Sequence, residues 1–270
     1  HNRESIQKLL WLAGKNLPVI YRPGIANRGL STPITEAGFL AMNNAAALAG
    51  MVLSQLKREG APFLRCSCAG GTFDMKTMVG LHSAPEVRGF NEELAHYYRL
   101  PCFGIGGTSD SKAVDEQAIM EASLTLMSAT LSGAQLIHDV GYLESGLSGS
   151  LLHLLICHEI IQWLARYMKG LVINEETLAL DLIEEIGPER SFLDTDHTYR
   201  HFREDHYPAL VDRRRYDDWA ANGQMTLAQR STQKVDELLM KHGPKKLPES
   251  IRRDLHRLAE EGLPINKDKG

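Results

Sequence analysis

The chain has little of the features that mark several specialised classes of protein. Only four of its 270 residues are cysteines, too few for a disulfide scaffold at this length. Its net charge is −4 and it has no long basic run, which excludes a general nucleic-acid binder. No apolar run approaches the roughly 18 residues that a membrane span needs, and the polar N-terminus HNRESIQ is no signal peptide. We therefore expect a cytoplasmic protein with no nucleic-acid or membrane partner.

The motifs of several familiar chemistries are also absent. The glycine run from Gly104 to Gly107 lacks the later glycine of a dinucleotide-binding turn, and there is no Walker loop. The chain has no GxSxG elbow of a serine hydrolase, and neither CxxC nor HExxH marks a metal site. The sequence therefore predicts no bound nucleotide cofactor and no metal.

Two groups of residues have the composition of a metal site without its spacing. Cys66 and Cys68 alternate along an expected strand and so face one way. Cys102 and His138 lie on other strands, but small buried apolar residues are the favoured interpretation of these cysteines. The segment HTYRHFRED, at 197–205, interleaves histidines with arginines, which favours a solvated, salt-bridged surface.

What the chain does have is a strand-then-helix pattern that repeats four times. The expected strands lie at 17–21, 61–68, 101–105 and 134–141, and the helices at about 34–56, 84–98, 114–131 and 151–169. Proline after Thr32 predicts the start of the first of these helices, and a further helix at 2–13 precedes the pattern. Each strand is short and apolar on both faces, as a parallel sheet covered by helices requires. The pattern predicts an α/β fold.

Four such units are half of a TIM (β/α)8-type barrel. An isolated half-barrel would expose two long sheet edges, which proteins avoid. Either the chain is the C-terminal part of a longer protein or a partner closes the sheet, and the first is favoured. We expect 1–171 to supply barrel units and 172–270 a helical tail packed on the barrel, with helices near 176–186, 226–242 and 248–261.

In such barrels the chemistry lies in the loops after the strands. After the third strand come Gly106 and Gly107, where the absence of Cβ atoms permits close approach of a ligand. Asp110 follows and can hold a cationic group or a proton. The alternative is that Ser109 or Asp110 satisfies backbone donors before the next helix.

Two further loops carry carboxylates and aromatic rings at the same edge. The fourth strand leads into His138, Asp139, Tyr142 and Glu144, which suit a small cation: a carboxylate supplies charge and a ring supplies a cation–π face. The alternative is a satisfied histidine and an exposed glutamate. The loop at 68–77 adds Phe73 and Asp74, or is a plain turn.

Three blocks of this sequence resemble the trimethylamine methyltransferase family, a corrinoid-dependent group. They are 31–56 (STPITEAGFLAMNNAAALAGMVLSQL), 100–118 (LPCFGIGGTSDSKAVDEQA) and 132–150 (SGAQLIHDVGYLESGLSGS). The tail segments 173–188 and 192–203 are also similar, so the resemblance runs from about residue 15 to about residue 260. It implies a TIM barrel with a substantial N-terminal region before this point.

The resemblance also implies a chemistry. The family's archetype uses pyrrolysine, which falls on Gly107 of this chain, and glycine cannot form the proposed imine adduct. The sequence therefore looks like the non-pyrrolysine branch, which demethylates quaternary amines such as glycine betaine. The methyl acceptor would be Co(I) of a corrinoid (cobalamin) carried by a separate partner protein, with no cofactor bound directly to this chain. A homo-oligomer is also expected.

The roles expected in such a methyltransferase follow from loop placement. The expected catalytic residues are Asp110, His138 and Glu144, and the expected substrate-binding residues are Phe73, Asp74, Gly107, Ser109 and Tyr142. Three alternatives stay open: a non-catalytic C-terminal fragment, an enzyme for trimethylamine or another methylated amine, and a zinc methyltransferase that uses Cys66 and Cys68.

Overall fold

The computed structural model describes residues 2–22, 24, 27–66, 71–84, 89–204, 208–243 and 245–261. The chain divides into two compact units, His1–Thr232 and Gln233–Gly270. The sheet and all the loops of the expected site belong to the first unit. The expected boundary between barrel units and tail, at 171/172, stays a prediction.

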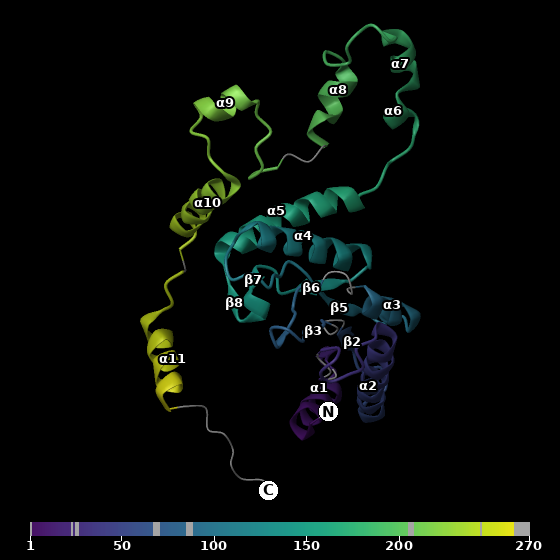
Figure 1. The fold of residues 1–270 in the computed structure, drawn as a ribbon, viewed down its shortest axis with the longest axis vertical. Coiled ribbons are helices and arrows are strands. Elements are labelled where there is room, and N and C mark those ends of the chain that lie inside the picture. The colour runs from purple at the N-terminus through teal and green to yellow at the C-terminus, as the bar shows by residue number, and fades with distance from the viewer. Residues whose placement is uncertain are drawn as a thin grey trace. The chain divides into compact units, whose positions relative to one another are not determined.

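A four-stranded parallel sheet forms the centre of the first unit (Figure 1). The order of its strands is β1 (Val19–Tyr21), β2 (Phe63–Cys66), β5 (Cys102–Ile105) and β6 (Leu136–His138). The helices α2 (Glu36–Lys57), α3 (Phe90–Tyr97) and α4 (Glu116–Leu131) connect successive strands, α5 (Leu151–Met168) follows β6, and α1 (Arg3–Gly14) precedes β1. The four strand–helix units are therefore confirmed, in sequential order.

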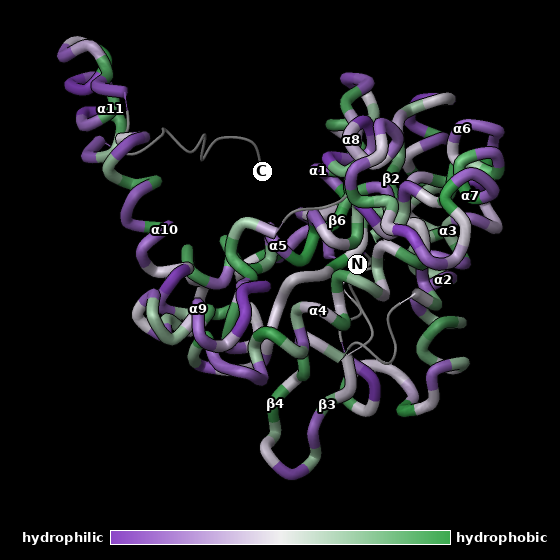
Figure 2. The backbone as a smooth tube through the Cα atoms, turned by 90° about the horizontal axis from the view of Figure 1, so that it is seen from above, coloured by the Kyte–Doolittle hydropathy of each residue, from purple (hydrophilic) through white to green (hydrophobic). Residues whose placement is uncertain are grey.

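The remaining elements are short. Two antiparallel hairpins, β3 (Phe73–Asp74) with β4 (Val79–Gly80) and β7 (Tyr142–Leu143) with β8 (Ser148–Gly149), follow β2 and β6. Figure 2 shows β3 and β4 running side by side. The later helices are α6 (Glu175–Leu178), α7 (Leu180–Ile186), α8 (Asp196–His201), α9 (Tyr216–Ala221), α10 (Leu227–Lys241) and α11 (Glu249–Glu261).

One face of the sheet is covered by helices. Val19, Tyr21 and Phe63 form an apolar cluster with Leu9 of α1. Arg65 is buried on the same face, where its guanidinium donates to the carbonyl of Asn91 in α3 and to the side chain of Asn43 in α2. At the other end of the sheet, Ile137 packs against Ala122 and Leu126 of α4 and Cys157 of α5.

The opposite face carries apolar side chains and no helix among the described residues. Cys66 of β2 packs there against Ile105 and Phe103 of β5. Ile20 of β1 and Leu136 of β6 are 44% and 48% exposed, although they lie on strands. A parallel sheet with helices on one face only is compatible with part of an α/β barrel, because a doubly wound sheet has helices on both faces.

Helix α2 is long and apolar enough to cross a membrane by length and composition. Its buried positions form one stripe, which comprises Phe39, Asn43, Ala47, Gly50 and Ser54. Gly50 lies against the ring of Tyr21, where a Cβ atom would overlap the ring. The spacing of the stripe and its contact with the sheet are those of a helix that packs on a core along one face.

The start of α2 differs from the expectation at Thr32 and Pro33. The helix begins at Glu36, with Thr35 in the flanking extended position. Thr32 instead forms a β-bridge with Arg28, and its carbonyl accepts from the amide of Gly29. This local turn holds residue 32 outside the helix, so the proline lies before the helix rather than in its first position.

Candidate functional site

The loops after β5 and β6 form one assembly at the carboxyl edge of the sheet. The amide of Gly141 donates to the carbonyl of Gly107 at 2.8 Å, and the amide of Ser109 donates to the carbonyl of Tyr142 at 3.0 Å. The amide of Glu144 donates to the carbonyl of Ser111 at 2.9 Å. Backbone hydrogen bonds therefore bring together the two loops that carry most of the expected site residues.

Asp110 ties a third loop into this assembly. Its carboxylate accepts from the Oγ of Ser83 at 2.6 Å, from the Oγ of Ser145 at 2.8 Å and from the amide of His82 at 2.9 Å. Burial raises the pKa of Asp110, but these hydrogen bonds outweigh burial and hold that pKa below its usual value. Since the side chain is buried and both oxygens accept from protein donors, it fastens the loops after β2, β5 and β6 to one another.

Hydrogen bonds to helix α4 fix the position of Ser109. Its Oγ donates to Glu121 of that helix at 2.7 Å, and the amide of Asp110 donates to the same carboxylate oxygen at 2.8 Å. The Oγ of Ser109 also accepts from the amide of Ser111. Ser109 is fully buried, so the alternative that it satisfies local backbone donors describes its contacts well.

The two glycines after β5 allow close packing within the protein. A Cβ atom at Gly106 would lie 3.2 Å from Cα of Leu126 in α4. Gly107 has φ of +72°, and a Cβ atom there would lie 3.1 Å from Cα of Val140 and 3.4 Å from Sγ of Cys157 in α5. A side chain at position 107 would therefore strain the backbone and press on Val140 and Cys157.

A carboxylate lies between two imidazoles at the end of β6. Asp139 accepts from Nδ1 of His138 at 2.6 Å and from Nε2 of His82 at 2.8 Å. The ring of His138 stacks on Phe103 of β5, with centroids 4.2 Å apart and planes 11° from parallel. Neighbouring strands and the loop after β4 thus position the Asp139 carboxylate and the two imidazoles at the carboxyl edge of the sheet.

Asp139 is the strained and ionised member of this cluster. Its backbone has φ of +68°, which is costly for a residue with a side chain and occurs where the surroundings fix it. Burial raises the pKa of Asp139, but the hydrogen bonds from His138 and His82 dominate and leave the pKa far below its ordinary value. The cluster therefore keeps a carboxylate anionic in a half-buried position.

Sequence reasoning missed one member of this cluster, His82. It grouped Asp139 with His138, Tyr142 and Glu144 after the fourth strand but gave Asp139 no role of its own. His82 had no local signal, since it follows the hairpin of β3 and β4 and reaches Asp139 across 57 residues of sequence.

The other expected residues lie in different surroundings. Tyr142 is 44% exposed and Glu144 is exposed on the same loop, so both are accessible to a ligand. Phe73 and Asp74 lie on the β3–β4 hairpin, where the Asp74 carboxylate accepts from the amide of Lys76 and the hydroxyl of Thr77. Asp74 thus closes its own turn, and in the described part of the chain it makes no hydrogen bond to another expected site residue.

The cysteines do not converge. Cys66 lies on the apolar face of the sheet, whereas Cys102 pairs in register with Arg65 and lies on the face that the helices cover. Cys157 is fully buried in α5, where burial raises the pKa of its thiol to about 11. Cys68 lies outside the described residues. Cys66 and Cys102 therefore cannot share a metal ion.

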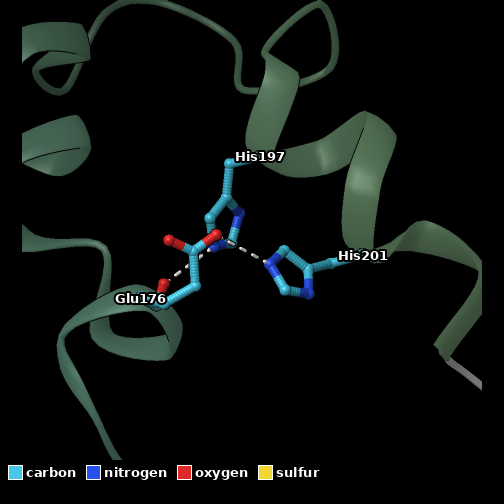
Figure 3. Close-up of side chains that lie close together, drawn as sticks. All are labelled: Glu176, His197 and His201. Carbon is cyan, nitrogen blue, oxygen red and sulfur yellow. Dashed lines mark hydrogen bonds and ion pairs between the residues drawn. The ribbon is translucent and has the colours of Figure 1, made fainter.

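A different set of side chains does converge in the later helices. Glu176 of α6 and His197 and His201 of α8 each place one ligand atom within 4.8 Å of the others (Figure 3). Arg200 also forms an ion pair with Glu176, at 2.8 Å, in agreement with the salt-bridged surface expected for the segment 197–205. His206 lies outside the described residues.

Comparison with known proteins places the chain in a family. The family model described as trimethylamine methyltransferase (MTTB) matches residues 1–260. The chain belongs to the trimethylamine methyltransferase family. Its relatives carry two different activity names. It is 36% identical over 236 residues to a protein named trimethylamine methyltransferase MttB from Desulfitobacterium hafniense (strain DSM 10664 / DCB-2), covering 86% of this chain and 47% of that one.

Two further relatives have similar sequence identity and coverage. A trimethylamine methyltransferase MttB from Methanosarcina thermophila is 35% identical over 234 residues, covering 86% of this chain and 48% of that one. A glycine betaine methyltransferase from Desulfitobacterium hafniense (strain Y51) is 33% identical over 246 residues, covering 89% and 51%. The chain therefore spans about half the length of the curated relatives it matches, and identity alone does not separate the two named substrates.

Proposed function

We propose that this member of the trimethylamine methyltransferase family transfers a methyl group from a quaternary amine, such as glycine betaine, to a corrinoid carried by a partner protein. The observation that carries the substrate class is Gly107. The family resemblance implies a reactive pyrrolysine at this position for trimethylamine. Here the residue is glycine, its φ is +72°, and a Cβ atom would lie within 3.4 Å of Val140 and Cys157.

Chemistry without a covalent activator suits a quaternary amine. Its nitrogen already carries the positive charge, so the departing nitrogen keeps the electron pair of the broken C–N bond and leaves as a neutral tertiary amine. The partner's corrinoid supplies the Co(I) nucleophile that accepts the methyl group. The task of this chain is then to orient one methyl group and exclude water, which can lower a barrier by several kcal/mol.

The accessible loop after β6 supplies the groups that a quaternary ammonium needs. The ring of Tyr142 offers a cation–π face and the carboxylate of Glu144 offers opposite charge, and both are exposed. Asp139 adds a carboxylate that the two histidines keep ionised. His138, at the end of β6, is the residue we assign to a substrate carboxylate. Asp110 and Ser109 position the loops.

Substitutions at Tyr142 test this assignment. We expect Tyr142→Leu to raise KM for the quaternary amine several-fold, because the cation–π face is lost, whereas Tyr142→Phe keeps the ring and stays close to wild type. Glu144→Gln should also raise KM. Methyl transfer to a reduced corrinoid protein, followed through the cobalt spectrum, is the readout. Unchanged KM in Tyr142→Leu and Glu144→Gln would remove these residues from the binding site.

A second candidate is that this chain is an incomplete, non-catalytic part of such an enzyme. The exposed apolar residues Ile20 and Leu136 on the uncovered face favour it, because a complete barrel buries that face. Further strands preceding this chain would cover it and complete a TIM barrel. Methyl transfer and sedimentation measured for this chain and for a longer version separate the two candidates: activity of both supports the enzyme, and activity of the longer version alone supports the incomplete part.

The remaining expectations belong to the same proposal. We place the enzyme in the cytoplasm, where corrinoid chemistry with Co(I) finds reducing conditions, and as a homo-oligomer.

A further inference from the structure

The geometry points to a zinc-type metal site made by Glu176, His197 and His201, separate from the proposed methyl-transfer loops. The two histidines are four residues apart on α8, so they project from one face of the helix. The centroids of their rings are 4.5 Å apart, and Glu176 of α6 faces both rings (Figure 3). Two imidazoles and one carboxylate are a donor set that suits zinc and its transition-metal neighbours.

The distances between the donor atoms fit a shared ion. Nε2 of His201 and Oε1 of Glu176 are 3.2 Å apart. Ligands about 2.1 Å from a tetrahedral zinc ion lie about 3.4 Å from each other. His197 is held at the same place, because its Nε2 lies 3.1 Å from the backbone carbonyl of Glu176. The ligand atoms lie within 4.8 Å of one another, so no distance between them has to shorten by more than about 1.4 Å to reach that spacing.

A second carboxylate orients one of the histidines. Nδ1 of His201 lies 2.8 Å from Oε1 of Glu204, in the turn that follows α8. Metal-bound histidines commonly donate their other ring N–H to a carboxylate, which fixes the tautomer and aims the free nitrogen at the metal. Glu204 thus acts as a positioning residue and leaves Nε2 of His201 facing Glu176.

The surroundings of the site favour an ion with one open coordination position. Glu176 and His197 line a cavity of about 830 Å³ between α6, α7 and α8. The short helices α6 and α8 have no buried residue of their own, so an ion shared between them would join two weakly supported elements. A water molecule in the cavity can fill the fourth position.

One side chain competes with the ion. Nη1 of Arg200 lies 2.8 Å from Oε1 of Glu176, and its side chain is 59% exposed. An exposed arginine can swing into solvent, and such surface pairs contribute little to stability. Arg200 therefore weakens metal binding without blocking it, and its removal is a test that a misfolded protein cannot imitate.

Titration of the metal-free chain, with any affinity tag removed, tests the site. We expect one equivalent of Zn²⁺ per chain by calorimetry, at least tenfold weaker binding in His201→Ala and in Glu176→Gln, and about 10- to 100-fold weaker binding in Glu204→Gln. Arg200→Ala should bind severalfold more tightly. His158→Ala, exposed on α5, is the matched control and should bind as wild type does. Circular dichroism checks that each variant folds.

Three other outcomes would overturn the site. Co²⁺ in place of Zn²⁺ should give the visible bands of a nitrogen- and oxygen-ligated ion; a thiolate charge-transfer band would move the metal to the cysteines. Equal affinity of wild type, His201→Ala and Arg200→Ala would also contradict the proposal. Mg²⁺ should not displace Zn²⁺, because Mg²⁺ prefers a site made of oxygen ligands. Competition by Mg²⁺ at equal concentration would contradict the donor set.

Discussion

Asp139 and Asp110 show how two neighbouring carboxylates acquire different roles. Asp110 is buried and accepts only from protein donors of the adjoining loops, so it holds the architecture. Asp139 accepts from two histidine side chains at the sheet edge and is thereby kept ionised. Each carboxylate lies in a loop that follows a strand of the sheet, and their hydrogen-bond partners distinguish their roles.

Asp139 predicts an acid dependence of stability. A carboxylate whose pKa is lowered on folding stabilises the protein above the unfolded value, near pH 4, and that contribution is lost as pH falls further. We expect Asp139→Asn to lower the free energy of unfolding by about 1–3 kcal/mol at pH 7. Its stability should also fall less steeply below about pH 4 than that of wild type. Urea unfolding across pH measures both, and parallel pH profiles for the two proteins would contradict the ionised state.

Gly107 predicts a steric cost that can be separated from a backbone cost. Gly107→Ala should lower stability by more than about 1–2 kcal/mol, the cost of a left-handed backbone alone, because its Cβ would also press on Val140 and Cys157. Gly60 is the matched control, since its φ is +76° and no atom lies within 4 Å of a Cβ there. Equal losses in Gly107→Ala and Gly60→Ala would show that position 107 has room.

For single residues, the sequence predicted where in the fold they lie better than it predicted which side chains they contact. His138 ends β6, and Tyr142 and Glu144 lie in the segment that follows it at the sheet edge, while their roles stay predictions. The contact of His82 with Asp139 could not be predicted, because it depends on how the β3–β4 hairpin returns to the sheet. The packing of Gly107 against α5 could not be predicted either. A pair of glycines is equally compatible with close approach of a ligand and with close packing inside the protein.

At the scale of elements, Gly50 decides how closely α2 approaches the sheet. Alanine is ordinarily about 1 kcal/mol better than glycine inside a helix, yet a Cβ at position 50 would overlap the ring of Tyr21. Gly50→Ala should therefore lower stability by about 1–3 kcal/mol through overpacking.

A double-mutant cycle supplies the control for Gly50. In a Tyr21→Leu background the ring is gone, so the same substitution should cost less or become favourable. Thermal unfolding of the four proteins gives the coupling between the two positions. A penalty of equal size in both backgrounds would mean that Tyr21 does not set the distance between α2 and β1.

The sequence predicted the existence of the elements and missed some of their boundaries. Periodicity and terminal residues located α5 within one residue, since Ser150 caps its start. The helix expected at 176–186 is instead two, α6 and α7, because Ala179 adopts a left-handed conformation with φ of +49°. No residue with a preference for that conformation marks the break, so composition gave no warning.

At the scale of the whole molecule, the four-stranded parallel sheet has helices on one face and exposes apolar side chains on the other. Ile20 and Leu136 remain half exposed on the face without helices. The curated relatives are about twice as long as the matched region. The second unit contains α11, whose Ile251, Leu255 and Leu258 are also about half exposed; Figure 2 shows the alternation of hydrophobic and hydrophilic residues along it.

This surface predicts that the chain alone exposes apolar area. We expect a dye that fluoresces on apolar surfaces to bind this chain more strongly than a longer version that carries preceding strands. Substituting Ile20 and Leu136 with threonine should weaken dye binding to this chain while the fold, measured by circular dichroism, persists. Equal dye binding by the shorter and longer proteins would contradict an uncovered barrel face.

We propose that a quaternary amine donates the methyl group. The most direct measurement offers glycine betaine, other quaternary amines and trimethylamine separately to the enzyme with a reduced corrinoid protein, and follows cobalt methylation spectrally. We predict methylation from at least one quaternary amine and none from trimethylamine, because position 107 holds a glycine, which has no reactive side chain. Methylation from trimethylamine and from no quaternary amine would contradict the account.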